Sequence, residues 1–104
     1  MKEYIEVLIK TPGSNMMRQA RIKNDLNTMQ DIVGGYIETV TALEDLVCIC
    51  NEEGRIRGLP YNMCWLGIDL VGTVIFAGVD GDEFGDLPDY VRDNTERWFG
   101  LKCL

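Results

Sequence analysis

The sequence contains no histidine, and its one serine is Ser14. Histidine is the usual general base for serine and cysteine nucleophiles and the commonest metal ligand. Its absence excludes Ser-His and Cys-His catalytic arrangements. A cysteine activated by a basic residue would be the remaining nucleophile, but the cysteines lie in apolar or terminal contexts that are typical of inert thiols. We therefore predict that the protein is not an enzyme, with no catalytic residues and no cofactor.

Long apolar runs are also missing. The longest, around residues 46–50 and 71–79, are far shorter than the ~20 residues that a bilayer-spanning helix needs. Glu3 and Glu6 interrupt the first apolar residues, whereas a signal peptide has a basic start and then an uninterrupted apolar run. We expect no membrane partner and a cytoplasmic location.

The four cysteines do not have the spacing of a metal site. Zinc knuckles need paired C-x-x-C motifs, whereas Cys48 and Cys50 are two apart and Cys64 and Cys103 are isolated. We predict four free thiols, because a protein without an export signal meets a reducing compartment. Cys48 and Cys50 would share one face of a strand. We predict no metal centre from these residues.

One acidic turn resembles the opening of a calcium-binding loop. In the segment from Asp80 to Gly85, acids occupy positions one and three and glycine occupies position six. The pattern then fails, because Phe84 stands at position five and Val91 at position twelve. A weak cation site and a plain acidic turn are both open readings, and we favour the turn.

The charge balance favours basic partners. The chain has 17 acidic and 10 basic residues, a formal net charge of −7. Such a surface repels phosphate backbones and anionic lipids and attracts basic proteins, so we expect no direct binding to nucleic acid. A run of acids near the C-terminus is the predicted partner-binding surface, although the same acids would also serve only to keep the protein soluble. The residues are Asp80, Asp82, Glu83, Asp86, Asp89 and Asp93.

Residue patterns predict a single α+β domain over residues 1–104. Alternating apolar residues, turn formers and helical spacing indicate strands, a helix, further strands and a closing helix. The sheet would be mostly antiparallel, with about five strands and two helices. The expected strands are Tyr4–Lys10, Met17–Lys23, Tyr36–Ala42, Leu46–Asn51, a short one at Arg55–Arg57, and a central one at Val71–Val79. The expected helices are Asp25–Val33 and Leu87–Phe99, and Tyr61–Leu70 would be a partly buried connection.

A second candidate site lies in the middle of the chain. If the segment around Arg55 and Arg57 is extended, both guanidinium groups lie on one face. Together with Asn51 and Asn62 they would hold a phosphate or carboxylate. This predicts a small-ligand or nucleotide-signal binding protein as an alternative. The competing interpretation is that the two arginines are solvated beside neighbouring glutamates.

Four segments resemble a known family. They are Met29 to Glu38 with the core VGGYIE, Cys50 to Arg55 (CNEEGR), Gly58 to Asn62 (GLPYN), and Gly72-Thr73 with Gly78 to Gly81. Together they resemble an uncharacterised domain family of phages, mobile elements and gut bacteria. The resemblance spans roughly residues 4–85 and supplies no catalytic residues.

The resemblance implies an anti-defence role in a bacterial host cell. Small acidic proteins of that setting include anti-CRISPR inhibitors of Cas9-type nucleases, whose arginines and positive channel an acidic domain can occupy. Our first hypothesis is therefore a non-enzymatic binding protein that blocks a basic host protein, such as a Cas9-type nuclease. The alternatives are the small-ligand protein and a housekeeping module of a mobile element. The sequence predicts no oligomeric state.

Overall fold

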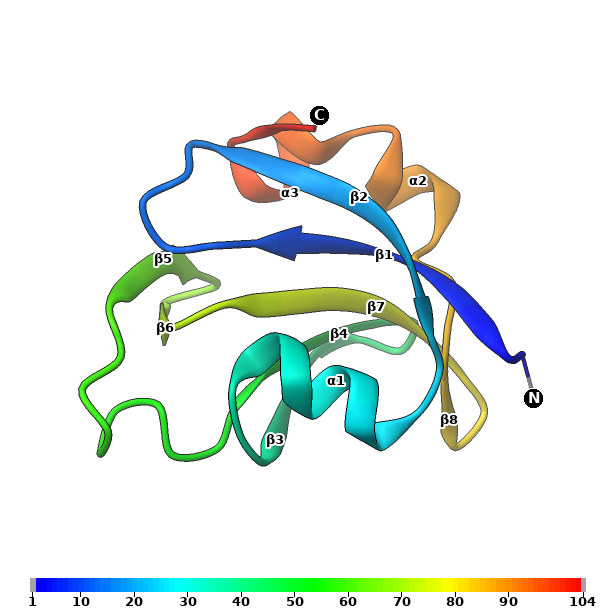
Figure 1. The fold of residues 1–104 in the computed structure, drawn as a ribbon. Coiled ribbons are helices and arrows are strands. Elements are labelled where there is room, and N and C mark those ends of the chain that lie inside the picture. The colour runs from blue at the N-terminus through cyan, green and yellow to red at the C-terminus, as the bar shows by residue number, and fades with distance from the viewer. Residues whose placement is uncertain (1, 104) are drawn as a thin grey trace.

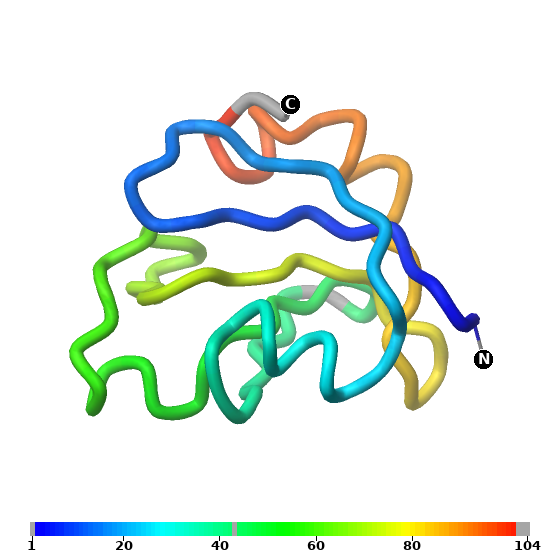
Figure 2. The backbone as a smooth tube through the Cα atoms, in the orientation of Figure 1, coloured from blue at the N-terminus to red at the C-terminus, as the bar shows by residue number. Residues whose placement is uncertain are grey.

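The computed structural model describes residues 2–103, and Figures 1 and 2 show the path of the chain. Two strands open it as an antiparallel hairpin, β1 (Tyr4–Lys10) and β2 (Met16–Lys23). The turn between them contains Pro12 and Gly13, whose backbone preferences interrupt strand pairing. The two strands expected at Tyr4–Lys10 and Met17–Lys23 are confirmed.

Helix α1 (Leu26–Val33) follows and confirms the helix expected at Asp25–Val33. The Asp25 carboxylate accepts a hydrogen bond from the Thr28 N–H at 2.7 Å, which satisfies one of the free donors of the first turn. Gly34 closes the helix with a φ of +81°, a left-handed conformation that glycine adopts without steric cost.

Strands β3 (Ile37–Leu43) and β4 (Leu46–Asn51) form the predicted antiparallel pair. A register shift between Thr41 and Leu43 marks an irregularity near the connection. In β4, Leu46 to Ile49 are all buried, because β4 has a neighbour on each side and packing on both faces.

The predicted strand at Arg55–Arg57 is wrong, because residues 52–58 form consecutive turns. The Arg57 N–H donates to Glu53 O and the Leu59 N–H to Gly54 O, each at 2.9 Å, so the backbone bonds locally rather than across a ladder. Gly54 allows this coil to pack closely, since a Cβ there would lie 2.8 Å from Val71 Cγ2. Tertiary packing thus overrides the local alternation.

The segment expected to be an irregular connection is a second hairpin, β5 (Tyr61–Trp65) and β6 (Ile68–Val71). Leu66 and Gly67 form its turn with φ values of 51° and 78°, as in the two-residue turns that suit strand twist. Trp65 and Leu70 are buried. The hairpin therefore covers core surface, as the sequence indicated for this segment.

The central strand is β7 (Val74–Asp80), buried from Val74 to Gly78 as predicted for a strand covered on both faces. It begins three residues later than expected, because Gly72 has a φ of +71° and separates it from β6. A tight turn then leads to β8 (Glu83–Gly85), which pairs antiparallel with the end of β7.

The predicted C-terminal helix over Leu87–Phe99 is interrupted. The structure has α2 (Asp89–Arg92) and α3 (Thr95–Phe99), separated at Asn94, whose φ of −135° is not helical. The Asn94 side chain donates to Tyr90 O at 2.7 Å and stabilises the break. Within residues 2–103, no helix has the length and apolarity that crossing a membrane requires.

Seven strands form one large sheet in the order β3-β4-β7-β1-β2-β9, with β8 paired to β7, and β5 and β6 form a separate two-stranded sheet. Strand β9 (Lys102–Cys103) pairs parallel with the start of β2. Every other pair is antiparallel. The predicted α+β class with a mostly antiparallel sheet is confirmed. Residues 2–103 contain nine strands and three short helices, where about five and two were expected.

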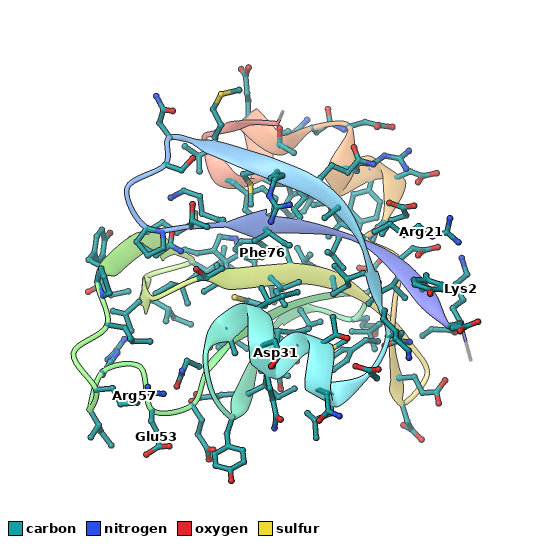
Figure 3. All side chains as sticks on the ribbon, viewed as in Figure 1. Lys2, Arg21, Asp31, Glu53, Arg57 and Phe76 are labelled. Atoms are coloured by element: carbon teal, nitrogen blue, oxygen red, sulfur yellow. The ribbon has the colours of Figure 1, made fainter. Side chains whose placement is uncertain are left out.

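The sheet has an apolar cluster on each face, and Figure 1 shows α1 on one side of β7 and β1, with α2 and α3 on the other. Met29 and Val33 of α1 pack on the first face. On the second face, rings from the β5–β6 hairpin, the sheet and α3 meet around Phe76, which Figure 3 labels. Trp65 lies 5.0 Å and Phe99 4.6 Å from the Phe76 ring, between centroids.

Candidate functional site

The turn between β7 and β8 carries three solvent-exposed carboxylates. Asp80 ends β7, Glu83 begins β8, and Asp82 lies between them. Gly81 has a φ of +64°, which makes the reversal tight enough for Asp80 and Glu83 to face each other across the two strands. None of the three forms an ion pair among the described residues. We call this group the acidic turn.

Asp86 has a different environment from the acidic turn. Its carboxylate accepts hydrogen bonds from the Lys2 ammonium and from the Glu6 N–H, the latter at 2.8 Å. The Leu87 N–H donates to Glu6 O at 2.8 Å, so the chain after β8 runs beside the start of β1. Asp86 therefore anchors the N-terminal strand.

Asp89 and Asp93 flank one arginine. Their carboxylates lie 3.1 Å and 3.2 Å from the Arg92 guanidinium on α2. Half of the six predicted partner-binding acids, namely Asp86, Asp89 and Asp93, thus have cationic neighbours within the chain. Of the six predicted acids, the three of the acidic turn are those without a cationic partner among the described residues.

A hollow of about 230 Å³ lies between the acidic turn and the start of α1. Asp82 and Glu83 line it together with Asp25 of the helix cap, and Met29 and Phe84 supply apolar surface. Leu26 at its rim is 54% exposed. We call this feature the acidic hollow.

One long-range hydrogen bond holds the acidic hollow together. The Asn24 side chain donates to Phe84 O at 3.2 Å and so ties the residues before α1 to β8. Sequence reasoning found the acids of the turn but not Asp25, Leu26 or Met29, because 60 residues separate Asn24 from Phe84. The one local sequence signal for the acidic hollow was Leu26, an apolar residue directly after the N-cap of the helix.

Two of the four predicted ligand-binding residues, Asn51 and Asn62, are buried and form hydrogen bonds with the backbone. The Asn51 amide donates to Val33 O at 3.2 Å, and its oxygen accepts from the Glu53 N–H at 2.8 Å. The Asn62 amide donates to the carbonyls of Lys10 and Gly72 at 2.9 Å and 2.7 Å. The hydrogen-bonding atoms of both side chains are therefore engaged inside the protein.

The two predicted arginines are exposed but do not converge. Arg55 donates to Asp69 O at 2.8 Å and lines a cleft of about 430 Å³ between β3, β4 and β6. Arg57 donates to Gly34 O at 2.9 Å and lines a separate hollow of about 480 Å³ beside Tyr36. Figure 3 shows Arg57 with Glu53 on the turn segment. The structure thus does not bring Asn51, Arg55, Arg57 and Asn62 into one site.

Two of the motifs that carry the resemblance, VGGYIE and CNEEGR, instead meet at the end of α1, together with Arg57. A Cβ on Gly35 would lie 2.9 Å from Asn51 Nδ2 and 3.0 Å from Arg57 Nη1. Glycine is needed for this close approach. The Asn51 amide and the Arg57 guanidinium also satisfy the last carbonyls of the helix, at Val33 and Gly34.

One protein family, described as a domain of unknown function (DUF3846), has a sequence profile that matches residues 4–100. The chain belongs to the DUF3846 family. The predicted resemblance to an uncharacterised domain family is thereby confirmed. No curated protein and no solved structure matches the chain.

Cys48, Cys50 and Cys64 of this DUF3846 chain are free thiols, and the side chain of Cys103 lies outside the described residues. Cys48 and Cys50 share one face of β4, as predicted. A hydrogen bond from the buried Cys48 lowers the pKa of the half-buried Cys50 and raises that of Cys48. Among the side chains that the structure describes, no three Cys, Asp or Glu residues are placed to hold a metal ion.

We expect Asp86→Asn to lower the melting temperature at neutral pH. The melting temperature of this variant should also fall less than that of the unsubstituted protein as the pH is lowered. Hydrogen bonds from Lys2 and from the Glu6 N–H hold the pKa of Asp86 below its usual range. A carboxyl with a lowered folded-state pKa stabilises the fold above its unfolded pKa of about 4, and this stabilisation is lost as the pH falls through the folded pKa. Melting curves between about pH 7 and pH 3 measure the effect.

The matched control for this experiment is Asp82→Asn. Asp82 is exposed, and the described residues give it no hydrogen-bond donor. This variant should keep the pH profile of the unsubstituted protein. Identical profiles for all three proteins would contradict the anchoring role of Asp86.

Proposed function

We propose that this protein is a non-enzymatic binding protein that uses the acidic hollow to recognise a basic partner protein. The observation that carries the proposal is the position of two exposed carboxylates without cationic partners among the described residues, Asp82 and Glu83, beside an apolar floor. The third acid of the lining, Asp25, lies 3.7 Å from the Lys23 ammonium. An arginine or lysine side chain has a matching structure, with an apolar stem and a charged head. The hollow therefore suits the side chain that a basic protein surface offers most often.

Electrostatics supports the same partner class. With a net charge of −7, the protein attracts a basic surface over a Debye length, which is about 8 Å at physiological salt. At contact, carboxylates pair with guanidinium groups through two parallel hydrogen bonds. Long-range attraction and short-range hydrogen bonding therefore both favour a partner with a basic surface.

The specific form that we propose is an anti-CRISPR-like inhibitor of a Cas9-type nuclease, in a phage or mobile element. Such a nuclease holds its guide-target duplex in a positively charged channel and reads the adjacent motif with arginines. A small acidic domain bound there would compete with the nucleic acid. The setting comes from the resemblance in the VGGYIE and CNEEGR segments, and the charge distribution is compatible with it.

The test is a pull-down with a Cas9-type nuclease at low and at moderate salt. A triple variant removes the charges of the acidic turn, and a second triple variant removes as many charges from α2 and α3. The first is Asp80→Asn, Asp82→Asn and Glu83→Gln, and the second is Asp89→Asn, Asp93→Asn and Glu96→Gln.

We expect the first variant to lose at least about tenfold in affinity, because each exposed charge pair contributes up to about 1 kcal/mol. The second variant should lose much less, since Asp89 and Asp93 are already paired with Arg92. Equal losses would mean that only net charge matters and would contradict a site at the acidic hollow. No association of the unsubstituted protein at either salt concentration would reject the nuclease as its partner.

A further inference from the structure

One edge of the large sheet has no neighbour. Strand β3 lies at the end of the strand order, and no strand that the structure describes pairs with its outer side. Of its seven residues, Glu38 alone is charged, and proline, lysine and arginine are absent. Edge strands are usually protected by such residues, because exposed backbone groups pair readily with another chain.

The backbone groups on this edge can be assigned from the ladder. The Glu52 N–H donates to Tyr36 O at 2.8 Å, so Tyr36 turns its carbonyl toward β4. Hydrogen-bonded and non-hydrogen-bonded pairs alternate along an antiparallel ladder, so every second residue of β3 points its N–H and C=O outward. These residues are Ile37, Thr39 and Thr41.

The opposite edge of the sheet is protected. Strand β2 carries Arg18, Arg21 and Lys23, and its first two residues pair with β9. Arg21 also covers the Tyr4 ring, with its guanidinium carbon 5.2 Å from the ring centroid. Figure 3 shows Arg21 near Lys2, at the end of the sheet away from Arg57. The open edge is therefore specific to β3.

The cleft of about 430 Å³ lies beside this open edge. Its acidic lining residues are Glu38 of β3, Glu52 after β4, and Asp69 of β6, and all three are exposed. Arg55 is its one cationic lining residue, and its guanidinium donates to the Asp69 carbonyl. The apolar lining includes Val40, Ile56, Ile68 and Leu70. The cleft thus combines an excess of negative charge with surface for aliphatic stems.

We propose that β3 adds an extended segment of a partner protein to the sheet, and that basic side chains at alternate positions of this segment enter the cleft. The outward backbone groups of Ile37, Thr39 and Thr41 would supply the hydrogen bonds, as in other cases of strand addition. The side chains of an added strand alternate between the two faces of the sheet. Every second residue of the partner segment therefore lies on the same face as Glu38 and Val40, which line the cleft. Lysine and arginine suit this position, because their charged heads complement the carboxylates of the cleft and their aliphatic stems cover its apolar lining.

Charge also decides against a second copy of this chain as the occupant. Pairing of two β3 strands would bring two cleft edges with an excess of carboxylates together, including two Glu38 side chains. Like charges close across a ladder are destabilising. A basic segment has the complementary charge and meets no such repulsion.

This inference rests on the proposed function only in the basic character of the partner, because its surface is separate from the acidic hollow. A nuclease that binds at the hollow need not use β3, and a peptide that binds β3 need not come from a nuclease. The two proposals can therefore fail independently.

The experiment titrates the ¹⁵N-labelled protein with a capped peptide, Thr-Lys-Val-Lys-Thr-Lys-Val, which matches the length of β3. We expect the largest amide shifts at Ile37, Thr39 and Thr41. The double variant Glu38→Gln with Asp69→Asn should weaken binding about 3- to 10-fold, as expected for two exposed charge pairs. The matched control, Asp31→Asn with Glu96→Gln, removes two charges from exposed residues outside both the cleft and the acidic hollow and should bind the peptide with unchanged affinity.

Two control peptides separate strand addition from simple charge attraction. One has the same composition with its lysines consecutive, and the other carries N-methyl groups on the residues that would donate to β3. We expect both to bind about tenfold more weakly, because register and backbone donors are lost. Equal binding of all three peptides would overturn the proposal, as would peptide-induced shifts confined to the acidic turn. Concentration-dependent shifts of β3 without peptide would assign the edge to a second copy and also overturn it.

Discussion

Replacing Gly78 with alanine should destabilise the protein more than any other glycine substitution. A Cβ at this position would lie 1.9 Å from Asp86 O and 2.8 Å from the carbonyl carbon of Asp86. The Asp86 backbone cannot retreat easily, because the Asp86 carboxylate accepts a hydrogen bond from the Glu6 N–H and the next residue, Leu87, donates to Glu6 O. Overpacking typically costs about 1–3 kcal/mol and occasionally more, and a clash with backbone atoms belongs at the upper end, about 3 kcal/mol. That is a large fraction of the ~5–15 kcal/mol that holds a domain folded.

Urea denaturation followed by circular dichroism measures this effect, with Gly81→Ala as the control. A Cβ on Gly81 would meet no atom within 4 Å, but the φ of +64° at this position still disfavours alanine. The control should therefore lose only about 1–2 kcal/mol. Equal losses in the two variants would show that the contact between β7 and the Asp86 segment relaxes freely.

The second large effect is expected for Asn62→Ala. The asparagine is 8% exposed and donates to two carbonyls, those of Lys10 and Gly72. Its oxygen also accepts a hydrogen bond from Lys10 Nζ at 3.0 Å, and Lys10 is only 3% exposed. Alanine would remove a donor from the two carbonyls and leave the Lys10 ammonium with only its hydrogen bond to Thr11 O, and the cost is about 2–4 kcal/mol.

Lys10→Met provides a way to separate the contributions to this loss. Burial already lowers the pKa of Lys10, because the charged ammonium is disfavoured away from water. In a Lys10→Met background, Asn62→Ala should cost less, since no buried ammonium loses its side-chain acceptor. Asn94→Ala is the exposed control, because this side chain also donates to a backbone carbonyl but in contact with water. A loss for Asn62→Ala as small as that for Asn94→Ala would contradict the argument.

The parts of the fold that the sequence predicts well depend on neighbours along the chain. The turn before β2, the Asp25 cap and the Gly34 terminus are each determined by residues within a few positions. The alternation around Arg55 and Arg57 was misleading, because the chain there coils against Val71 of a later strand. Such contacts have no signal in a local pattern.

The same distinction applies to the candidate site. The acids of the turn between β7 and β8 could be predicted, because exposure of a turn is a local property. The floor of the acidic hollow could not, since it requires Asn24 to meet Phe84. Asn51 and Asn62 looked like ligand-binding residues because polar side chains in a loop suggest function, yet both hydrogen-bond to buried backbone.

The central position of β7 also has a consequence during synthesis on the ribosome. The pair β1–β2 and the pair β3–β4 each form from adjacent residues, but β7 lies between β1 and β4. Until residues 74–80 emerge, the inner edges of both hairpins have no partner. The nascent chain therefore carries two separate hairpins with open edges, and these join into one sheet only after residues 74–80 have been made.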